Sequence, residues 1–368
     1  MGQAPGAARH RADRRALRPS LRPRSDGPTE VEPKGPREDL VGPYSPCPFR
    51  TKFYKDRYVQ TQEVRIMLRH VAAGIDGSPE SLAAAHWAAR DALRRGVALH
   101  LVHAWEWRPR PAPSVPMGVS QREWAEQTLT QASNSVRAAH PGLSIIDEPV
   151  PQSPVAALLA AAEQAELLVL GSRGLSGVAG FLVGSVSQRV VARSTCPVVL
   201  VRVGESSADE HFAAPGGVSP DEISETPYRD IVLGLDTGRP CDQLIEFAFE
   251  TARRCEAALR VVHVFSAPSA HTAADRLVPQ SGPELLAEHE HAVVAALRPW
   301  CEKFPEVAVA ETVVEGRAAN ELVRAASGAA LAVVGRRTRE ARLGTHIGSV
   351  AHAVLHHAGC PVAVIPHA

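Results

Sequence analysis

The sequence predicts an α/β protein built from two tandem, doubly wound domains, each with a parallel sheet. Three observations support this prediction. The chain has 368 residues, about the length of two ordinary domains. Short apolar runs alternate with longer helical patterns, which is typical of parallel strands joined by helices. The same succession of motifs also occurs twice, in the same order.

The repeat is visible as matched motifs at nearly constant separation. The separation is 160 positions for VAAGIDGS (71–78) and IVLGLDTG (231–238), and for LVHAW (101–105) and VVHVF (261–265). It is 164 positions for Gly171 and Gly335, Gly184 and Gly348, and Cys196-Pro197 and Cys360-Pro361. One four-residue change in length between these two groups indicates a tandem duplication.

The first half begins with an apolar run at 71–75 that predicts a buried strand. Ser78 is a suitable N-cap and Pro79 a suitable first residue for an alanine-rich helix, which runs to Arg95 and stops at Gly96. The later predicted elements are a strand at 98–104, a variable proline-rich connection at 108–119, a helix at 121–139, a strand near 143–146, a helix at 155–165, a strand at 167–170, a helix at 184–194 and a strand at 197–203.

The second half repeats this order from Ile231 to Ile365, and its last predicted strand covers 361–365. The expected domains are therefore 66–203 and 228–368. Between them, 204–227 is rich in Ser, Glu, Asp, Gly and Pro, which is typical of a linker.

Residues 1–65 fall outside the repeat. The first 60 residues hold 13 basic and 7 acidic residues and nine prolines, without apolar periodicity. Three interpretations stay open: a disordered basic tail, a mis-assigned start codon and a functional basic arm. Met67 directly precedes the first predicted strand, so we expect translation to begin near it. The intact mass of the natural product tests this, and peptides from residues 5–60 would contradict it.

Composition narrows the class of protein. Forty basic and forty acidic residues balance, which argues against a whole-protein nucleic-acid binder. The longest apolar stretches are far shorter than a membrane span, so no membrane partner is expected. The six cysteines form no CxxC pair or zinc spacing, which favours free thiols in the cytoplasm and no metal held by protein ligands alone.

The most informative segment is the glycine-spaced loop from Gly171 to Ser185. It follows a buried strand and ends at a helix start, where open α/β sheets bind ligands. Free amides at the helix start favour an anion, and the hydroxyls of Ser185 and Ser187 and the guanidinium of Arg173 add donors. We expect a phosphate cradle. Lysine occurs only at positions 34, 52, 55 and 303, so a Walker loop is excluded, and GxGxxG is absent after either first strand.

The spacing Gly171-x2-Gly174-x9-Gly184-Ser185 resembles the ATP-binding signature of the universal stress protein family. VAAGIDGSPESLAAAHWAARDALRRG resembles the first strand and helix of that family, and Cys196-Pro197-Val198-Val199-Leu200-Val201 its closing strand. The resemblance covers 66–203 and 228–368. It implies the adenine-nucleotide α-hydrolase-like fold and an ATP-binding stress protein without a dedicated metabolic reaction.

The resemblance also implies a set of binding residues. Ile75 and Asp76 would lie near the ribose or adenine and the backbone of Ala104 near the adenine edge, with Asp76 as an outer-sphere partner of a phosphate-bound Mg²⁺. The ribose and phosphates would be enclosed by Gly171, Arg173, Gly174, Gly184, Ser185, Val186 and Ser187. A purely local role stays open for Asp76 as a helix cap and for the glycines as loop formers.

The second half departs from this pattern. The middle glycine is replaced by Thr338, which narrows the approach of the backbone to a ligand, and Gly238 stands in place of Ser78. Extra arginines in this loop either compensate or belong to a solvated basic surface. The corresponding candidate residues for a weaker ATP site are Leu235, Asp236, Val264, Gly335, Arg337, Gly348, Ser349 and Val350.

Three functions are weighed. The first is a cytoplasmic, ATP-binding regulator, and the second an ATP-using enzyme of the same fold with adenylating or slow hydrolytic activity. The third is an interaction module with degenerate sites, which suits the second half best. No nucleophile, base or metal-binding carboxylate cluster accompanies the loop, so no catalytic residue is assigned. His352 and His356 share a helix face and could bind a metal, but a solvent-facing helix is the preferred interpretation. The last strands of the two halves are expected to pair as an internal pseudo-dimer, with a larger homo-oligomer also possible.

Overall fold

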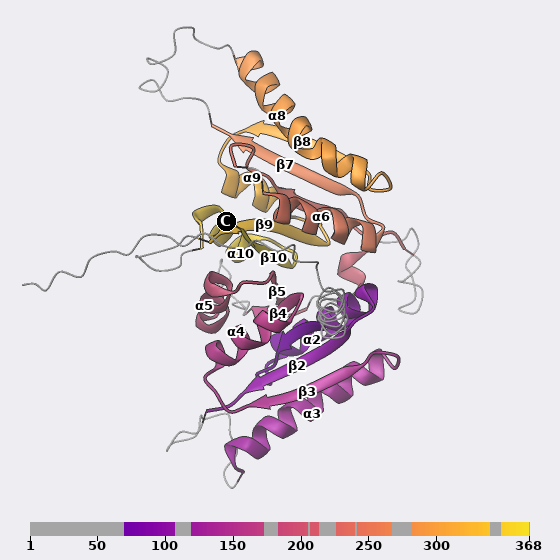
Figure 1. Ribbon diagram of the computed structural model, residues 1–368, viewed down its shortest axis with the longest axis vertical. Coiled ribbons are helices and arrows are strands. Elements are labelled where there is room, and N and C mark those ends of the chain that lie inside the picture. Colours follow the sequence, from indigo (N-terminus) through magenta and orange to yellow (C-terminus); the bar gives the residue numbers. More distant parts are fainter. Residues whose placement is uncertain are drawn as a thin grey trace, which may run out of the picture. The chain divides into compact units, whose positions relative to one another are not determined.

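The computed structural model describes residues 70–106, 119–172, 183–204, 207–212, 226–239, 241–266, 282–338 and 347–367. Its strands form one ten-stranded sheet in the order β3-β2-β1-β4-β5-β10-β9-β6-β7-β8 (Figure 1). Each repeat contributes five strands, and in each the first strand lies in the middle of its group. This is the predicted doubly wound α/β arrangement, present twice.

The first repeat alternates strands and helices as the sequence predicts. Its elements are β1 (His70–Gly74), α2 (Pro79–Arg95), β2 (Ala98–Ala104), α3 (Gln121–Ala139), β3 (Ile145–Val150), α4 (Pro154–Gln164), β4 (Leu167–Ser172), α5 (Ser185–Arg193) and β5 (Val198–Arg202). All four strand pairs inside this repeat are parallel.

The second repeat has the same order. Its elements are β6 (Ile231–Gly234), α6 (Asp242–Cys255), β7 (Leu259–Phe265), α8 (Gly282–Lys303), β8 (Val309–Glu315), α9 (Ala318–Ala325), β9 (Leu331–Arg337), α10 (Ser349–His357) and β10 (Val362–His367). These strands are also parallel to one another.

The predicted strand at 143–146 is misplaced. Leu143 is buried in the core, and its amide donates to the His140 carbonyl in the turn that follows α3. The strand begins only at Ile145 and continues through Pro149, although proline is usually depleted in strands. Proline is tolerated there because β3 is an edge strand that pairs only with β2.

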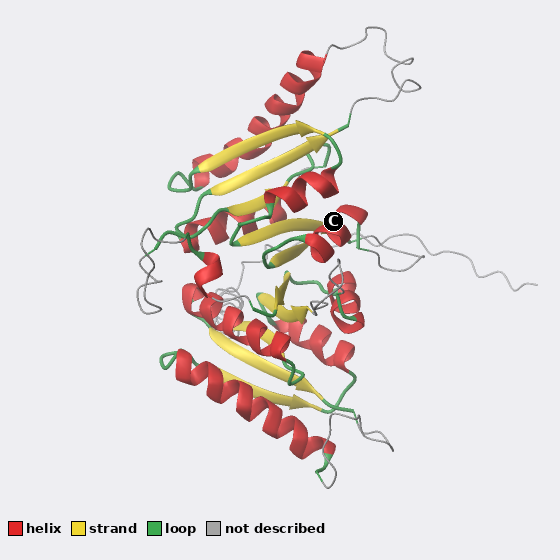
Figure 2. Cartoon of the chain, turned by 180° about the vertical axis from the view of Figure 1, so that it is seen from behind, coloured by secondary structure: helices red, strands yellow, loops and turns green. Residues whose placement is uncertain are grey.

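Helices cover both faces of the sheet (Figure 2). One core lies under α2, α3, α6 and α8, and the other lies under α4, α5, α9 and α10. Alanine, valine and leucine dominate both cores, so close helix–sheet packing replaces bulky aromatic side chains. No described helix is long and apolar enough to span a membrane.

The two repeats join through their last strands. β5 and β10 pair antiparallel, with Val198 opposite Val364, Val199 opposite Ala363 and Leu200 opposite Val362. This is the pairing expected from the sequence. It removes both apolar closing strands from the sheet edge, where unpaired backbone groups favour association with another chain.

Two buried arginines cross this junction. Arg202, at the end of β5, donates to the Leu355 carbonyl in the last turn of α10 at 3.4 Å. Arg336, in β9, donates to the Ser194 carbonyl that follows α5. Each cation therefore lies at the carboxyl end of a helix in the other repeat, where the helix dipole favours positive charge.

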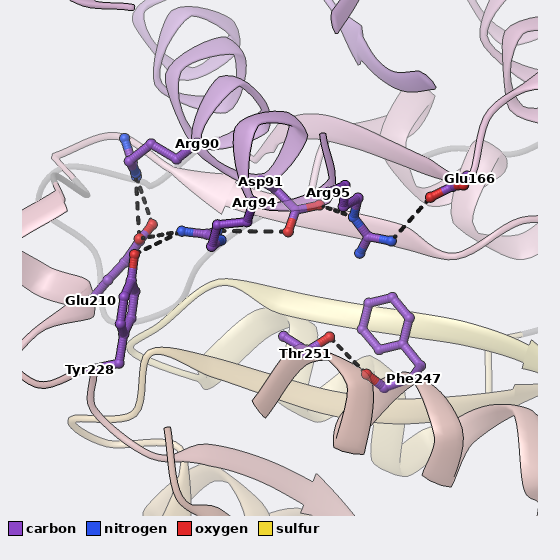
Figure 3. A network of polar contacts seen from close by, with 9 residues as sticks. All are labelled: Arg90, Asp91, Arg94, Arg95, Glu166, Glu210, Tyr228, Phe247 and Thr251. Carbon is purple, nitrogen blue, oxygen red and sulfur yellow. Dashed lines mark hydrogen bonds and ion pairs between the residues drawn. The ribbon is translucent and has the colours of Figure 1, made fainter. Parts of the chain in front are cut away.

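The described residues of the expected linker contribute to the interface between the two repeats. Residues 207–210 form a short 3-10 helix, and His211 bridges to Tyr228. The buried carboxylate of Glu210 accepts from Arg90 at 2.6 Å and lies 3.6 Å from Arg94, whose guanidinium also donates to the Tyr228 hydroxyl at 2.9 Å (Figure 3). The linker is thus anchored to α2 by a buried ionic cluster.

Breaking this cluster should destabilise the protein. In Glu210→Ala, Arg90 and Arg94 lose their shared carboxylate, and we expect a loss of about 3 kcal/mol or more in the free energy of unfolding. Glu302→Ala, which breaks an exposed i,i+4 pair with Arg298, should cost less than about 1 kcal/mol. Urea denaturation of both variants checks this, and equal midpoints would contradict the anchoring role of the linker.

Candidate functional site

The candidate site of the first repeat lies at the carboxyl ends of β1, β2 and β4. β1 pairs with β2 on one side and with β4 on the other, so the strand order reverses between β1 and β4. Ligands in open α/β sheets bind at such a switch point. Asp76, Ala104 and Gly171 follow or end these three strands, so the structure places these three candidates at the carboxyl ends of neighbouring strands.

The turn after β1 is held by the predicted aspartate. The Asp76 carboxylate accepts from the Ser78 amide at 2.9 Å and from the Ser78 hydroxyl, while Ser78 in turn caps α2 by accepting from the Ser81 amide. Ser78, and not Asp76, is therefore the N-cap of α2, and Asp76 holds the turn that positions this cap. Its side chain is also exposed at the carboxyl end of the sheet, where a ligand would lie.

His103, which matches His263 in the repeat, fixes the backbone beside this turn. Its Nδ1 lies 2.8 Å from the carbonyl oxygen of Ile75, and Ile75 is buried. Burial lowers the pKa of His103, against the smaller opposing effects of the Ile75 carbonyl and the Asp76 carboxylate. The neutral imidazole thus donates to Ile75 and orients the peptide that leads into Asp76.

Gly171 has a packing role that the sequence did not reveal. A Cβ atom there would lie 2.6–2.8 Å from backbone atoms of Glu80 and Ser81, at the start of α2. Only glycine permits this approach. The buried Ser187 hydroxyl donates to the Gly171 carbonyl at 3.2 Å, so this hydroxyl ties α5 to the end of β4.

The amino end of α5 has no side-chain cap from its N-cap residue. Its N-cap is Gly184, which has no side chain to cap the helix, and its first turn has no acidic residue. Helices α2 and α3 differ because serines cap them and glutamates stand in their first turns. The amides of Ser185, Val186 and Ser187 precede the first intrahelical donor, Gln188. Arg173 and Gly174 lie outside the described residues.

The second repeat reproduces two contacts of this site. Leu235 is buried and accepts from His263 at 2.9 Å, and the Asp236 carboxylate accepts from the Gly238 amide at 3.0 Å. The other candidates end β7 or β9 or begin α10, and they are Val264, Gly335, Arg337, Gly348, Ser349 and Val350. Ala351 replaces Ser187, so the hydroxyl tie between helix and glycine is absent here.

A histidine pair distinguishes the second repeat and was not anticipated. His263 Nε2 lies 3.0 Å from His289 Nδ1 and 3.3 Å from the Thr237 hydroxyl, and the His289 ring stacks on Phe265. The sequence signal was the recurrence of His103 and His263. The partner of His263 is on α8, and only the fold brings it close.

Metal-binding geometry is not found among the described residues. They hold no cluster of three or more His, Cys, Asp or Glu side chains suited to a metal ion. His352 and His356 do share a face of α10, with ring centroids 4.3 Å apart. None of the five described cysteines forms a disulfide, and burial raises the pKa of the Cys255 thiol to about 11.

The protein has a tandem α/β fold in which the strand order reverses once in each repeat. Its sequence matches the model of the universal stress protein family over residues 67–202 and again over 227–366. A universal stress protein of Mycobacterium bovis is 33% identical over 306 residues, covering 80% of this chain and 96% of that protein. One of Mycobacterium tuberculosis is 30% identical over 305 residues, covering 80% and 95%.

A solved universal stress protein from Archaeoglobus fulgidus shares the fold. Its TM-score is 0.56 at 18% identity, with 82% of this chain and 99% of that chain covered. The chain belongs to the universal stress protein family and carries two tandem copies of its domain.

The environment of His103 predicts a pH dependence of stability. Because its pKa is lowered in the folded state, the unfolded chain binds this proton first as the pH falls. The contribution of His103 should be complete above about pH 6.5, the usual value, and should be lost as the pH falls through the lowered pKa. Denaturation of wild type and His103→Gln between pH 7.5 and 5 should show a smaller acid-side loss in the variant.

The matched control is His291→Gln, because that side chain is exposed on α8. It should retain the wild-type slope of stability against pH. Identical slopes for His103→Gln and wild type would contradict the assignment of a neutral, buried His103.

Proposed function

We propose that this protein is a cytoplasmic regulatory protein whose first repeat binds an adenine nucleotide, ATP in particular. Nucleotide binding would change its shape or its association with partners, without a dedicated metabolic reaction. Membership of the universal stress protein family supports the proposal, and so does the retained spacing Gly171-x2-Gly174-x9-Gly184-Ser185. The lack of a disulfide among the five described cysteines supports a reducing compartment.

The observation that carries the proposal is the glycine-capped amino end of α5 at the switch point. Its N-cap, Gly184, supplies no side-chain cap, and its dipole presents partial positive charge beside the end of β4. Backbone donors of this kind suit phosphate oxygens. A cradle made of amides also explains how a lysine-free loop would hold a polyphosphate.

In this proposal the candidate residues divide between the two ends of the nucleotide. Ile75, Asp76 and the backbone of Ala104 would contact the nucleoside. The phosphates and ribose would contact Gly171, Arg173, Gly174, Gly184, Ser185, Val186 and Ser187. A Mg²⁺ bound to the phosphates would be reached by exposed Asp76 through water, because that carboxylate already holds the turn to Ser78.

The sharpest test is Ser185→Glu. A carboxylate at the first position of α5 suits the helix dipole, so the helix should remain folded. The same charge would occupy the proposed phosphate position. Two like charges about 4 Å apart cost about 4 kcal/mol near a protein surface, so the affinity for ATP should fall by at least about 100-fold. Calorimetric titration of the purified chain with ATP measures this loss.

Two controls make the result specific. Ser185→Ala removes one hydroxyl and should weaken binding only a few-fold, because the amides remain. Ser349→Glu makes the matched change at the start of α10. Unchanged ATP affinity in a folded Ser185→Glu protein would refute the site. Sustained release of ADP or AMP by wild type would favour an ATP-using enzyme instead.

A further inference from the structure

The helix that follows the second strand is held differently in the two repeats. The 164-residue separation also relates the ends of α3 and α8, so Ala125 of α3 corresponds to His289 of α8. Ala125 is fully buried, and so is Thr128 one turn later, whereas the first buried side chain described in α8 is Val293. The first part of α8, residues 282–292, therefore has few apolar contacts that hold it beside β7 and β8 (Figure 1).

His289 supplies contacts that this part of α8 otherwise lacks. Its ring stacks on Phe265, with ring centroids 4.4 Å apart, and its Nδ1 lies 3.0 Å from Nε2 of the buried His263. The hydroxyl of Thr237 lies 3.3 Å from the same Nε2. His289 thus joins α8 to the carboxyl end of β7, beside the turn that follows β6.

The hydrogen bonds determine where the protons are when both rings are neutral. Nδ1 of His263 lies 2.9 Å from the Leu235 carbonyl, which can only accept, so this nitrogen carries the hydrogen. Nε2 of neutral His263 is therefore an acceptor, and Nδ1 of His289 donates to it. The Thr237 hydroxyl is a second donor to the same nitrogen.

The pair can bind one proton and keep its hydrogen bond. A protonated His263 donates from Nε2 to Nδ1 of His289, whose own hydrogen then lies on its Nε2. A protonated His289 donates as before. A second proton places hydrogen on all four ring nitrogens, so two donors of like charge face one another and the bond breaks.

The surroundings of the pair favour its neutral form. Three carboxylates belong to the described elements around it: Glu288 on α8, Asp236 in the turn after β6, and Glu315 in β8, opposite Phe265. Burial, and after it the other ring, lower the pKa of His289 against an opposing effect of Glu288. The contribution of His289 to stability is therefore complete above about pH 6.5 and is lost as the pH falls through the lowered pKa.

We propose that the pair of His263 and His289 is a proton-sensitive latch that holds the first part of α8 on the second repeat. Binding of a second proton releases residues 282–292 from β7 and uncovers the Phe265 ring, which is buried while the latch is closed. The first repeat cannot form this latch, because Ala125 stands in place of His289. The inference does not depend on nucleotide binding.

Hydrogen exchange of the full chain, followed by mass spectrometry from about pH 7.5 to about pH 4.5, tests the latch. Exchange at each pH is compared with the intrinsic rate of the unfolded chain at that pH. Amides within 282–292 should lose about tenfold in protection on acidification, because one hydrogen bond is broken. Amides at the matched start of α3 should keep their protection.

Three variants separate the latch from other effects of acid. His289→Asn keeps a donor for neutral His263 and offers an acceptor to protonated His263, so its protection should persist in acid. His289→Phe keeps a ring on Phe265 without a nitrogen, so its protection should no longer respond to pH. His291→Gln changes an exposed histidine of the same helix and should behave like wild type. Circular dichroism establishes that each variant is folded.

Loss of protection in wild type that is absent from both His289 variants supports the latch. Unchanged protection of 282–292 in acid would overturn it, and so would an equal loss in α3 or the wild-type response in His289→Asn. ATP enters none of these measurements, so failure of the latch and failure of the proposed function are separate results.

Discussion

The antiparallel pairing of β5 with β10 is the constraint on which the rest of the structure depends. Each repeat ends in a predominantly apolar strand that must find a neighbour, and the two strands pair with one another. The pairing merges two five-stranded sheets and places α5 and α10 near the junction. The crossed arginines and the Glu210 cluster then stabilise an arrangement already determined by main-chain hydrogen bonds.

The same junction connects each candidate site to the opposite repeat through a helix. The helices whose amino ends face the sites, α5 and α10, have carboxyl ends in contact with Arg336 and Arg202 of the opposite repeat. Ser187 joins α5 to Gly171 in one repeat, and Ala351 leaves that link out in the other. The two sites are therefore equivalent in topology and different in chemistry.

The alternation of elements, the duplication and the switch-point location were predictable from the sequence, because strand periodicity, caps and glycine spacing are local signals. Ser78 and Gly96 marked the ends of α2 correctly. The predicted start of β3 was wrong because Leu143 is apolar for a different reason: it lies in a turn, and its side chain packs into the core. The predicted end was also wrong, because Pro149 made an edge strand look like a loop. The packing role of Gly171 and the anchor at Glu210 depend on residues far apart in the chain, which no local pattern reports.

Joining the repeats in one polypeptide has an evolutionary consequence. In a symmetric dimer of identical subunits, every substitution appears on both sides of the axis, so a change that closes one pocket closes its mate. A fused pair escapes that symmetry, and its effective concentration, of millimolar order for short connections, keeps the halves together however scarce the protein is. Ala351 in place of Ser187 is thus a change that only one half had to accept, and the fusion allows that half to acquire a separate task.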